Sequence, residues 1–228
     1  MSGREFVPNG AFPGPGSGPA SGPASGLGSG AASGSASGTV RPPARVLAEV
    51  AFLSGGTLQD PAAADRAFDS TQVSTDTRAL RPGDFFVALH GENHDGHDLL
   101  AQAVAAGACG ALVDRPGGPP GLPEVLVDDT TAGWQRWAAE HRRRFPEVRL
   151  VGLTGSSGKT TVKDLLGHLL AGEAPVLATA GNLNNHLGVP RTLLGLGPDH
   201  RYAVIEMGMN HPGEIAILSR MASPGAAL

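Results

Sequence analysis

The sequence predicts an α/β protein made of two successive units, the second of them built on a mostly parallel sheet with a phosphate-binding loop. Two observations lead to this fold class. From about residue 44 onward, short apolar runs typical of strands alternate with helix-patterned segments, and this alternation is typical of sheets covered by helices. The stretch TGSSGKTT at 154–161 lies between an apolar run and a helical pattern, which is the setting that a phosphate-binding loop requires.

The first 38 residues have a composition of their own. Thirty of them are Gly, Ser, Ala or Pro, and such a segment cannot bury enough apolar surface to offset the entropy lost on ordering. We therefore expect a disordered extension over residues 1–40. Its repeats are low complexity and do not indicate structural repeats.

The rest of the composition excludes several classes of protein. A net charge of −4 provides no basic surface for a nucleic acid, and we expect Arg142-Arg143-Arg144 to be the solvated end of a helix. Cys109 is the only cysteine, which excludes an internal disulfide, and its small neighbours suggest a buried structural thiol. No run of 18 apolar residues and no secretory pattern is present, so we expect a cytoplasmic protein without membrane insertion.

The first unit is expected over residues 41–146. The turn signal Arg81-Pro82-Gly83-Asp84 separates two of its strands. The predicted strands lie at 73–77, 85–89, 111–113 and 125–127, and the predicted helices at 44–53, 97–106 and 131–145. In the last helix, Trp134 and Trp137 lie at helical spacing, and we expect them in the core and not at a ligand.

The second unit is expected over residues 147–228. Its predicted strands lie at 149–153, 176–179 and 202–206, with one helix after the phosphate loop and another from about residue 213. The last residues, Ala226-Ala227-Leu228, have the pattern of a further strand. A nucleotide-binding sheet of this kind usually has five or more strands. The sequence therefore predicts an incomplete central domain.

The loop at 154–161 supplies the chemistry that polyphosphate requires. Its glycines let backbone N–H groups approach phosphate closely, and the helix that follows adds the positive end of its dipole. Lys159 offers a mobile cation for the outer phosphates, and the Thr160 hydroxyl can join a magnesium shell. The common motif has glycine where this chain has Leu153, so a plain glycine-rich turn with a surface lysine is the alternative.

Two later segments add polar side chains. Glu206 ends an apolar strand, where α/β sheets present groups to a ligand, and its carboxylate is suited to magnesium. His211 follows in a loop, either as an ordinary surface group or as a second contact to metal or phosphate. Asn184 and Asn185 belong to NLNNHLGVP at 182–190, which is explained either by Asx-turn chemistry alone or by a ligand site.

These segments together resemble the Mur ligase family, the ATP-dependent amide-forming enzymes that build the peptidoglycan stem peptide. The similar stretches are TGSSGKTTVKDLL at 154–166, NLNNHLGVPRTLL at 182–194, AVIEMGMNHPGEI at 203–215 and STDTRALRPGDFFVALHGENHDGHDLLAQAVAAGACGALV at 74–113. The resemblance covers about residues 45–228 and is greatest to the branch that adds D-alanyl-D-alanine. The family's own loop reads T-G-x-x-G-K-[ST], which accounts for Leu153.

The resemblance implies a small N-terminal UDP-substrate domain followed by a central ATPase domain, with ATP and Mg²⁺ as cofactors. Lys159 would contact the β- and γ-phosphates. Thr160 and Glu206 would ligate magnesium, and His211 would assist at a second magnesium. The residues that would wrap the ATP phosphates are Gly155, Ser156, Ser157, Gly158, Lys159, Thr160 and Thr161.

The resemblance also implies roles outside the loop. Asn184 and Asn185 would lie near the nucleotide and the metals. The residues that would face the UDP portion of the substrate are Thr77, Arg78, Asp95, Gly96 and His97. For the Asp-Gly-His segment a structural role is equally open, because it also makes a serviceable helix cap.

The implied reaction joins D-alanyl-D-alanine to UDP-N-acetylmuramoyl-tripeptide. A substrate carboxylate attacks the γ-phosphate to give an acyl phosphate, and the amine then displaces phosphate. Lys159, Glu206 and His211 are the expected catalytic residues, because the protein must neutralise crowded negative charge and align the reacting groups. A monomer is expected.

Mur ligases continue beyond the segments found here, with a C-terminal domain that binds the incoming amine and often a carboxylated lysine that bridges the metals. We therefore expect that the 228-residue chain by itself does not ligate. The alternatives are a MurE-type ligase, a folylpolyglutamate synthetase, another P-loop ATPase or kinase, or a UDP-sugar-binding module without catalysis.

Overall fold

A computed structural model describes residues 44–69, 72–91 and 94–228 of the chain. The extension expected over 1–40 lies outside these residues. The described residues all belong to one compact unit, and they form the α/β fold that the sequence predicts, with one five-stranded sheet, one four-stranded sheet and one two-stranded sheet. Across this described part of the chain, no helix combines the length and apolar character needed to span a membrane.

The five-stranded sheet lies in the first half of the chain. Its strands, in spatial order, are β2 (Thr57–Leu58), β7 (Glu124–Leu126), β6 (Gly110–Val113), β5 (Phe85–Val87) and β4 (Val73–Ser74). All neighbours are parallel except β2, which runs antiparallel to β7 at the edge. A separate antiparallel pair joins β1 (Ala44–Val46) to β3 (Ala67–Asp69).

Both faces of this sheet are covered, because its buried side chains alternate along each strand. Phe85 and Val87 pack into one core with α1 (Leu47–Ser54) and α3 (Thr130–Arg143), whereas Phe86 packs into a second core with α2 (Leu100–Ala105). In the described connections, 3₁₀ helices lie at Pro61–Ala63, Thr77–Ala79 and Gly96–Leu99.

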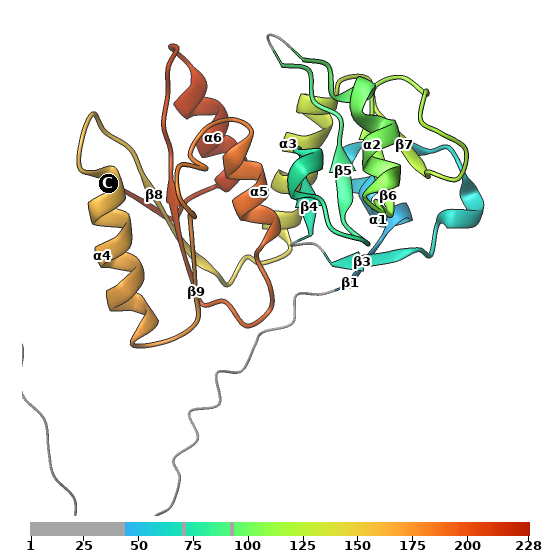
Figure 1. Cartoon of the computed structure of the whole chain (residues 1–228). Helices are drawn as coiled ribbons and strands as arrows, with labels where there is room; N and C mark the ends of the chain where they lie inside the picture. The colour runs from blue at the N-terminus through green and yellow to red at the C-terminus, as the bar shows by residue number, and fades with distance from the viewer. Residues whose placement is uncertain (1–43, 70–71, 92–93) are drawn as a thin grey trace, which may run out of the picture. The chain divides into compact units, whose positions relative to one another are not determined.

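The four-stranded sheet is entirely parallel and positions the candidate site. Its spatial order is β11 (Ala226–Ala227), β8 (Arg149–Leu153), β10 (Tyr202–Glu206) and β9 (Val176–Ala178). Figure 1 shows α4 (Lys159–Ala171) on one face of this sheet and α5 (Gly188–Leu194) and α6 (Glu214–Ala222) on the other.

Helix α3 contacts α1 on one side and both α5 and α6 on the other. Trp134 and Trp137 are fully buried on it, and their rings meet edge to face with centroids 5.6 Å apart. Trp137 also meets the ring of Phe85, on the five-stranded sheet, at 5.6 Å. The expectation that both tryptophans are core residues is confirmed, and α3 supplies apolar contacts to elements of both sheets.

Three local expectations differ from the structure. The helix predicted from residue 44 begins only at Leu47, because Ala44–Val46 pair as a strand with residues 21 to 25 positions later in the sequence. Helix α5 was not predicted and directly follows the asparagine turn. Pro190 lies in its first turn, where the missing N–H breaks no helical hydrogen bond. Cys109 is half-buried instead of buried, and burial raises the pKa of its thiol to about 11.

The prediction for the arginine triplet is wrong at Arg142, which is buried. Its guanidinium donates to the carbonyl oxygens of Ala222, Phe145 and Val148 at 3.1, 2.6 and 3.2 Å. Burial lowers its pKa. The three carbonyls come from the end of α6 and from the connection before β8. The end of α3, which its charges suggest to be solvated, therefore connects α3 to α6 and to the start of β8.

A buried His–Arg contact joins β1 to α3. Nη2 of Arg45 lies 2.5 Å from Nδ1 of His141, and Nε2 of His141 lies 3.0 Å from the carbonyl oxygen of Leu196. A neutral imidazole with its proton on Nε2 satisfies both contacts. Burial and the charge of Arg45 lower the pKa of His141 from 6.5 to about 3, against the opposing effect of the Leu196 carbonyl.

This contact predicts a pH dependence of stability. Between pH 6.5 and about 3 the unfolded chain binds a proton on His141 that the folded chain does not, so the free energy of unfolding falls as the pH falls. The loss approaches about 1.4 kcal/mol per pH unit. Urea unfolding at several pH values should give a shallower slope for His141→Gln than for the natural chain. His168→Gln, on the exposed side of α4, should leave the slope unchanged, and equal slopes in all three proteins would contradict the assignment.

Candidate functional site

The glycine-rich loop connects β8 to α4 and has the backbone shape of an anion-binding turn. Gly155 and Gly158 have φ values of 143° and 79°, a region that side chains with a Cβ rarely adopt. Among the described residues, no side chain caps the first N–H groups of α4, so these donors are available to a ligand. The ammonium of Lys159 donates to the carbonyl oxygen of Gly155 at 2.6 Å and thus curls over the loop.

Glu206 lies at the carboxyl end of β10, directly beside the loop. The parallel register pairs Glu206 with Leu153, the last residue of β8, so both strands end at the same level of the sheet. Glu206 is 2% exposed. Its Oε2 accepts from the Thr160 hydroxyl at 3.0 Å and its Oε1 from Nδ2 of Asn184 at 2.9 Å. The sheet therefore joins three of the predicted site residues in one hydrogen-bonded group.

A fourth side chain, which the sequence argument missed, holds the backbone of Glu206. The N–H of Glu206 donates to the Thr179 hydroxyl at 2.9 Å. Thr179 is buried and follows the last residue of β9, the neighbour of β10. The strand-end rule that identified Glu206 also applies to Thr179, so the signal was present in the sequence.

The two asparagines of the 182–190 segment have different roles in the fold. Oδ1 of Asn185 accepts from the N–H groups of Leu187 and Gly188 at 3.1 and 2.8 Å, which is Asx-turn chemistry at the start of α5. Asn184 instead directs its side chain to Glu206. The Asx-turn explanation is therefore found at Asn185, whereas a ligand role for Asn184 stays a prediction.

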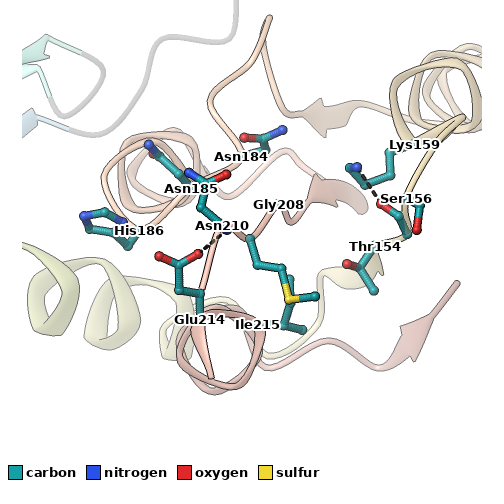
Figure 2. Close-up of a pocket in the computed structure, with 12 residues that line it drawn as sticks. Thr154, Ser156, Lys159, Asn184, Asn185, His186, Gly208, Asn210, Glu214 and Ile215 are labelled. Atoms are coloured by element: carbon teal, nitrogen blue, oxygen red, sulfur yellow. Dashed lines mark hydrogen bonds between the residues drawn. The ribbon is translucent and has the colours of Figure 1, made fainter. Parts of the chain in front are cut away.

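A cavity of about 700 Å³ lies over these groups. Figure 2 shows Thr154, Ser156 and Lys159 on one side of it and Asn185, His186 and Glu214 on the other. Its lining residues are Thr154, Gly155, Ser156, Lys159, Asn184, Asn185, His186, Gly208, Met209, Asn210, Glu214 and Ile215. Thr160 and Glu206 form the part-buried polar pair beside it. A hollow of this size is typical of a small-molecule site, and its mostly polar lining suits a charged ligand.

His211 lies at the edge of this region, and its imidazole faces Glu214. Its Nδ1 lies 3.4 Å from Oε1 of Glu214, and its side chain is 80% exposed. The cavity lining, drawn from the described residues, does not include it. Hydrogen bonds from the N–H groups of Asn210 and His211 lower the pKa of Glu214. Glu214, which was not predicted as a site residue, thus orders the loop that carries His211.

Three of the five predicted UDP residues line a second hollow, of about 560 Å³, in the first half of the chain. Its lining includes Thr77, Arg78 and Asp95, but not Gly96 or His97. The Arg78 guanidinium binds both carboxylate oxygens of Asp76. That side-chain hydrogen bond, with one from the backbone N–H of Arg78, lowers the pKa of Asp76 to about 2.

Asp95 and Gly96 have structural roles in addition to any binding role. Oδ1 of Asp95 accepts from the N–H of His97 at 2.9 Å and caps the 3₁₀ helix that follows. A Cβ on Gly96 would lie 2.7 Å from the backbone of Ala88, so this position requires glycine. Burial would raise the pKa of Asp95, but hydrogen bonds from His97 and Arg115 outweigh it and lower the pKa below its usual range.

Among the described residues, His90, Asp95 and His97 lie close enough together to hold a metal ion. The two imidazoles stack with centroids 5.1 Å apart. Arg115 already pairs with Asp95, and its Nη1 lies 3.3 Å from Asp114. Because Arg115 supplies the positive charge that balances the carboxylates of Asp95 and Asp114, this cluster is explained as a set of ion pairs.

Helix α3 holds the backbone of residues 182–190, which we call the asparagine segment. Nε1 of Trp134 donates to the carbonyl oxygen of Leu187 at 3.2 Å, and Nε2 of Gln135 to that of His186 at 3.3 Å. These contacts were not predicted, because they join residues about 50 positions apart. Through these contacts α3, the last helix of the first predicted unit, touches the segment that carries Asn184.

Comparison with known proteins gives two family matches. The Mur ligase middle domain matches residues 153–228, and the Mur ligase family, catalytic domain matches residues 69–130. The chain is 48% identical over 182 residues to the UDP-N-acetylmuramoyl-tripeptide–D-alanyl-D-alanine ligase of Escherichia coli strain K12, across 80% of this chain and 39% of that protein. The ligase of the same name from Bacillus subtilis strain 168 is 40% identical, across 81% and 40%.

Solved structures agree with these matches. A crystal structure of MurF from Acinetobacter baumannii superposes with a TM-score of 0.77 and 38% identity, over 82% of this chain and 41% of that one. The MurF ligase from Thermotoga maritima in complex with ADP gives a TM-score of 0.60 and 34% identity, over 68% and 36%. The chain spans about 40% of the length of the curated relatives it matches.

The asparagine segment predicts a sensitive position at Gly188. A Cβ there would lie 2.5 Å from the backbone of Leu183, so Gly188→Ala must displace the segment. We expect a loss of about 1–3 kcal/mol in the free energy of unfolding, the usual cost of overpacking. Gly117→Ala is the matched control, because a Cβ at Gly117 meets no atom within 4 Å. Equal urea midpoints for the two variants would show that the close approach does not constrain the segment.

Proposed function

Since this chain belongs to the Mur ligase family, we propose that it binds ATP in the cavity beside Lys159 and acts in peptidoglycan precursor synthesis. The proposed reaction is that of an acid–D-amino-acid ligase, joining D-alanyl-D-alanine to UDP-N-acetylmuramoyl-tripeptide through an acyl phosphate. The proposed place of the reaction is the cytoplasm, where ATP and UDP-linked precursors are found. The names of the relatives, UDP-N-acetylmuramoyl-tripeptide–D-alanyl-D-alanine ligases, support the choice of amine and acceptor.

One observation carries the proposal: the hydrogen-bonded group of Thr160, Glu206 and Asn184 at the mouth of the glycine-rich loop. A turn with uncapped helix N–H groups suits a polyphosphate, and a buried carboxylate beside it suits the cation that accompanies the nucleotide. The ADP complex of a MurF ligase with 34% identity to this chain adds support for a nucleotide at this fold.

The donor set fits magnesium. Thr160 and Glu206 offer a hydroxyl and a carboxylate oxygen 3.0 Å apart, and oxygen is the ligand that Mg²⁺ prefers. These two residues would hold the ion. When bound, magnesium neutralises charge on the phosphates during transfer.

The protein's own groups would bind and align the phosphates. Lys159 would exchange its contact with the Gly155 carbonyl for the β- and γ-phosphates, and the first N–H groups of α4 would donate to them. Ser156, Ser157 and Thr161 complete the proposed phosphate loop. The proposal also assigns His211 to a second magnesium, for which its imidazole would turn away from Glu214.

The proposed UDP site is the hollow beside Thr77 and Arg78. Arg78 is exposed and paired with Asp76, so its guanidinium can reach a diphosphate by leaving an exposed ion pair, which is worth little. Gly96 and His97 would act indirectly, by holding Asp95 and the adjacent loop in place.

Nucleotide binding tests the first half of the proposal. Calorimetric titration of the 228-residue chain with a non-hydrolysable ATP analogue and Mg²⁺ should show one site. Lys159→Ala should weaken binding about 10- to 100-fold, which corresponds to a hydrogen bond between charged groups. The same variant should retain its affinity for UDP-N-acetylmuramoyl-tripeptide. No nucleotide binding by the natural chain would refute the proposal.

The choice of amine is tested separately, in the full-length gene product that contains this sequence. ADP release is measured with UDP-N-acetylmuramoyl-tripeptide and a panel of amine acceptors. D-alanyl-D-alanine should stimulate release, because the relatives are named for that amine. Stimulation by another amine alone would exclude this branch of the family while leaving the ATP site intact.

A further inference from the structure

We infer that Asn184 is a positioning residue for the cation site: it fixes the Glu206 carboxylate and does not act by contacting the nucleotide. The inference rests on the proposed ATP and magnesium site. Asn184 lines the cavity, so a direct nucleotide contact is the competing role. The hydrogen bonds of Asn184 favour the first role.

The Glu206 carboxylate has one partner on each oxygen. Asn184 donates to Oε1 at 2.9 Å, and Thr160 donates to Oε2 at 3.0 Å. The two hydrogen bonds differ in whether the donor group must move when a cation binds. The Thr160 oxygen is itself a candidate ligand, so its bond to Glu206 is open to change, whereas the amide of Asn184 has no need to move. Asn184 is thus the partner that can hold the carboxylate both with and without a cation.

Asn184 is itself fixed by the strand exit that carries Glu206. Its carbonyl oxygen accepts from the N–H of Gly208 at 2.7 Å, and its N–H donates to the carbonyl of Asn182 at 2.8 Å. A Cβ on Gly208 would lie 3.1 Å from the Asn184 side chain. The side-chain amide of Asn184 therefore binds Glu206, and its backbone carbonyl binds Gly208, two residues further along the chain.

The segment that carries Asn184 has further anchors. The Asn185 side chain closes the following turn, and α3 donates to the carbonyls of His186 and Leu187. A side chain held in this way loses little conformational freedom when it binds a carboxylate. Partners of this kind, one step removed from a metal, commonly change metal affinity by 10- to 100-fold when they are removed.

The test measures ADP affinity of the 228-residue chain by calorimetry, once in EDTA and once in saturating Mg²⁺. In the natural chain, magnesium should tighten ADP binding. Asn184→Ala should lose about 10- to 100-fold of that magnesium effect and keep its affinity in EDTA. Asn182→Ala, an exposed asparagine of the same segment, is the matched control and should behave as the natural chain in both conditions.

The outcomes are distinguishable. Equal weakening of Asn184→Ala in EDTA and in Mg²⁺ would make Asn184 a nucleotide contact, and no weakening in either would remove its role; both results overturn the inference. If the natural chain binds no ADP in Mg²⁺, the proposed function fails and the inference falls with it. Circular dichroism checks that the variant folds. Should Asn184→Ala unfold, Asn184→Leu keeps the size of the side chain without its donor and is measured in the same two conditions.

Discussion

The parallel pairing of β8 with β10 is the constraint on which the candidate site depends. Their register ends both strands at the same level, Leu153 beside Glu206. Because the loop to α4 leaves from β8 at that level, the first turn of α4 comes within hydrogen-bonding distance of Glu206. A shift of one residue in this pairing would turn the Glu206 side chain to the opposite face of the sheet, and Thr160 would lose its partner.

Helix α3 extends this constraint beyond the sheet. Its apolar side packs Trp137 against the five-stranded sheet, and its polar groups donate to the carbonyls of the asparagine segment. At its end, Arg142 binds carbonyls from α6 and the connection to β8. Helix α3 thus supports two parts of the site. One is the asparagine segment, whose Asn184 binds Glu206, and the other is the connection into β8, the strand before the phosphate loop. The predicted boundary between the two units falls after this helix, yet the packing of α3 crosses it.

Much of this arrangement could be predicted from local sequence, and the reason is physical. A glycine-rich loop between strand and helix is recognised from a few neighbouring residues, and so is an acidic residue at a strand end. Strand β10 has the predicted bounds of 202–206. Strand β1 and the burial of Arg142 could not be predicted in the same way. Both depend on partners that lie 21 to 80 positions away, and a charged triplet gives no sign that carbonyl groups will surround it.

The asparagine segment shows where a motif reaches its limit. Asn184 and Asn185 are neighbours with the same side chain, and composition cannot assign one to the turn and the other to Glu206. The assignment comes from the close approach of Gly188 to Leu183, which bends the segment back on itself. Once it is bent, Asn185 faces the N–H groups of the new helix and Asn184 faces the strand end. The glycine therefore supports the carboxylate indirectly, because it leaves room for the bend from which the amide of Asn184 reaches Glu206.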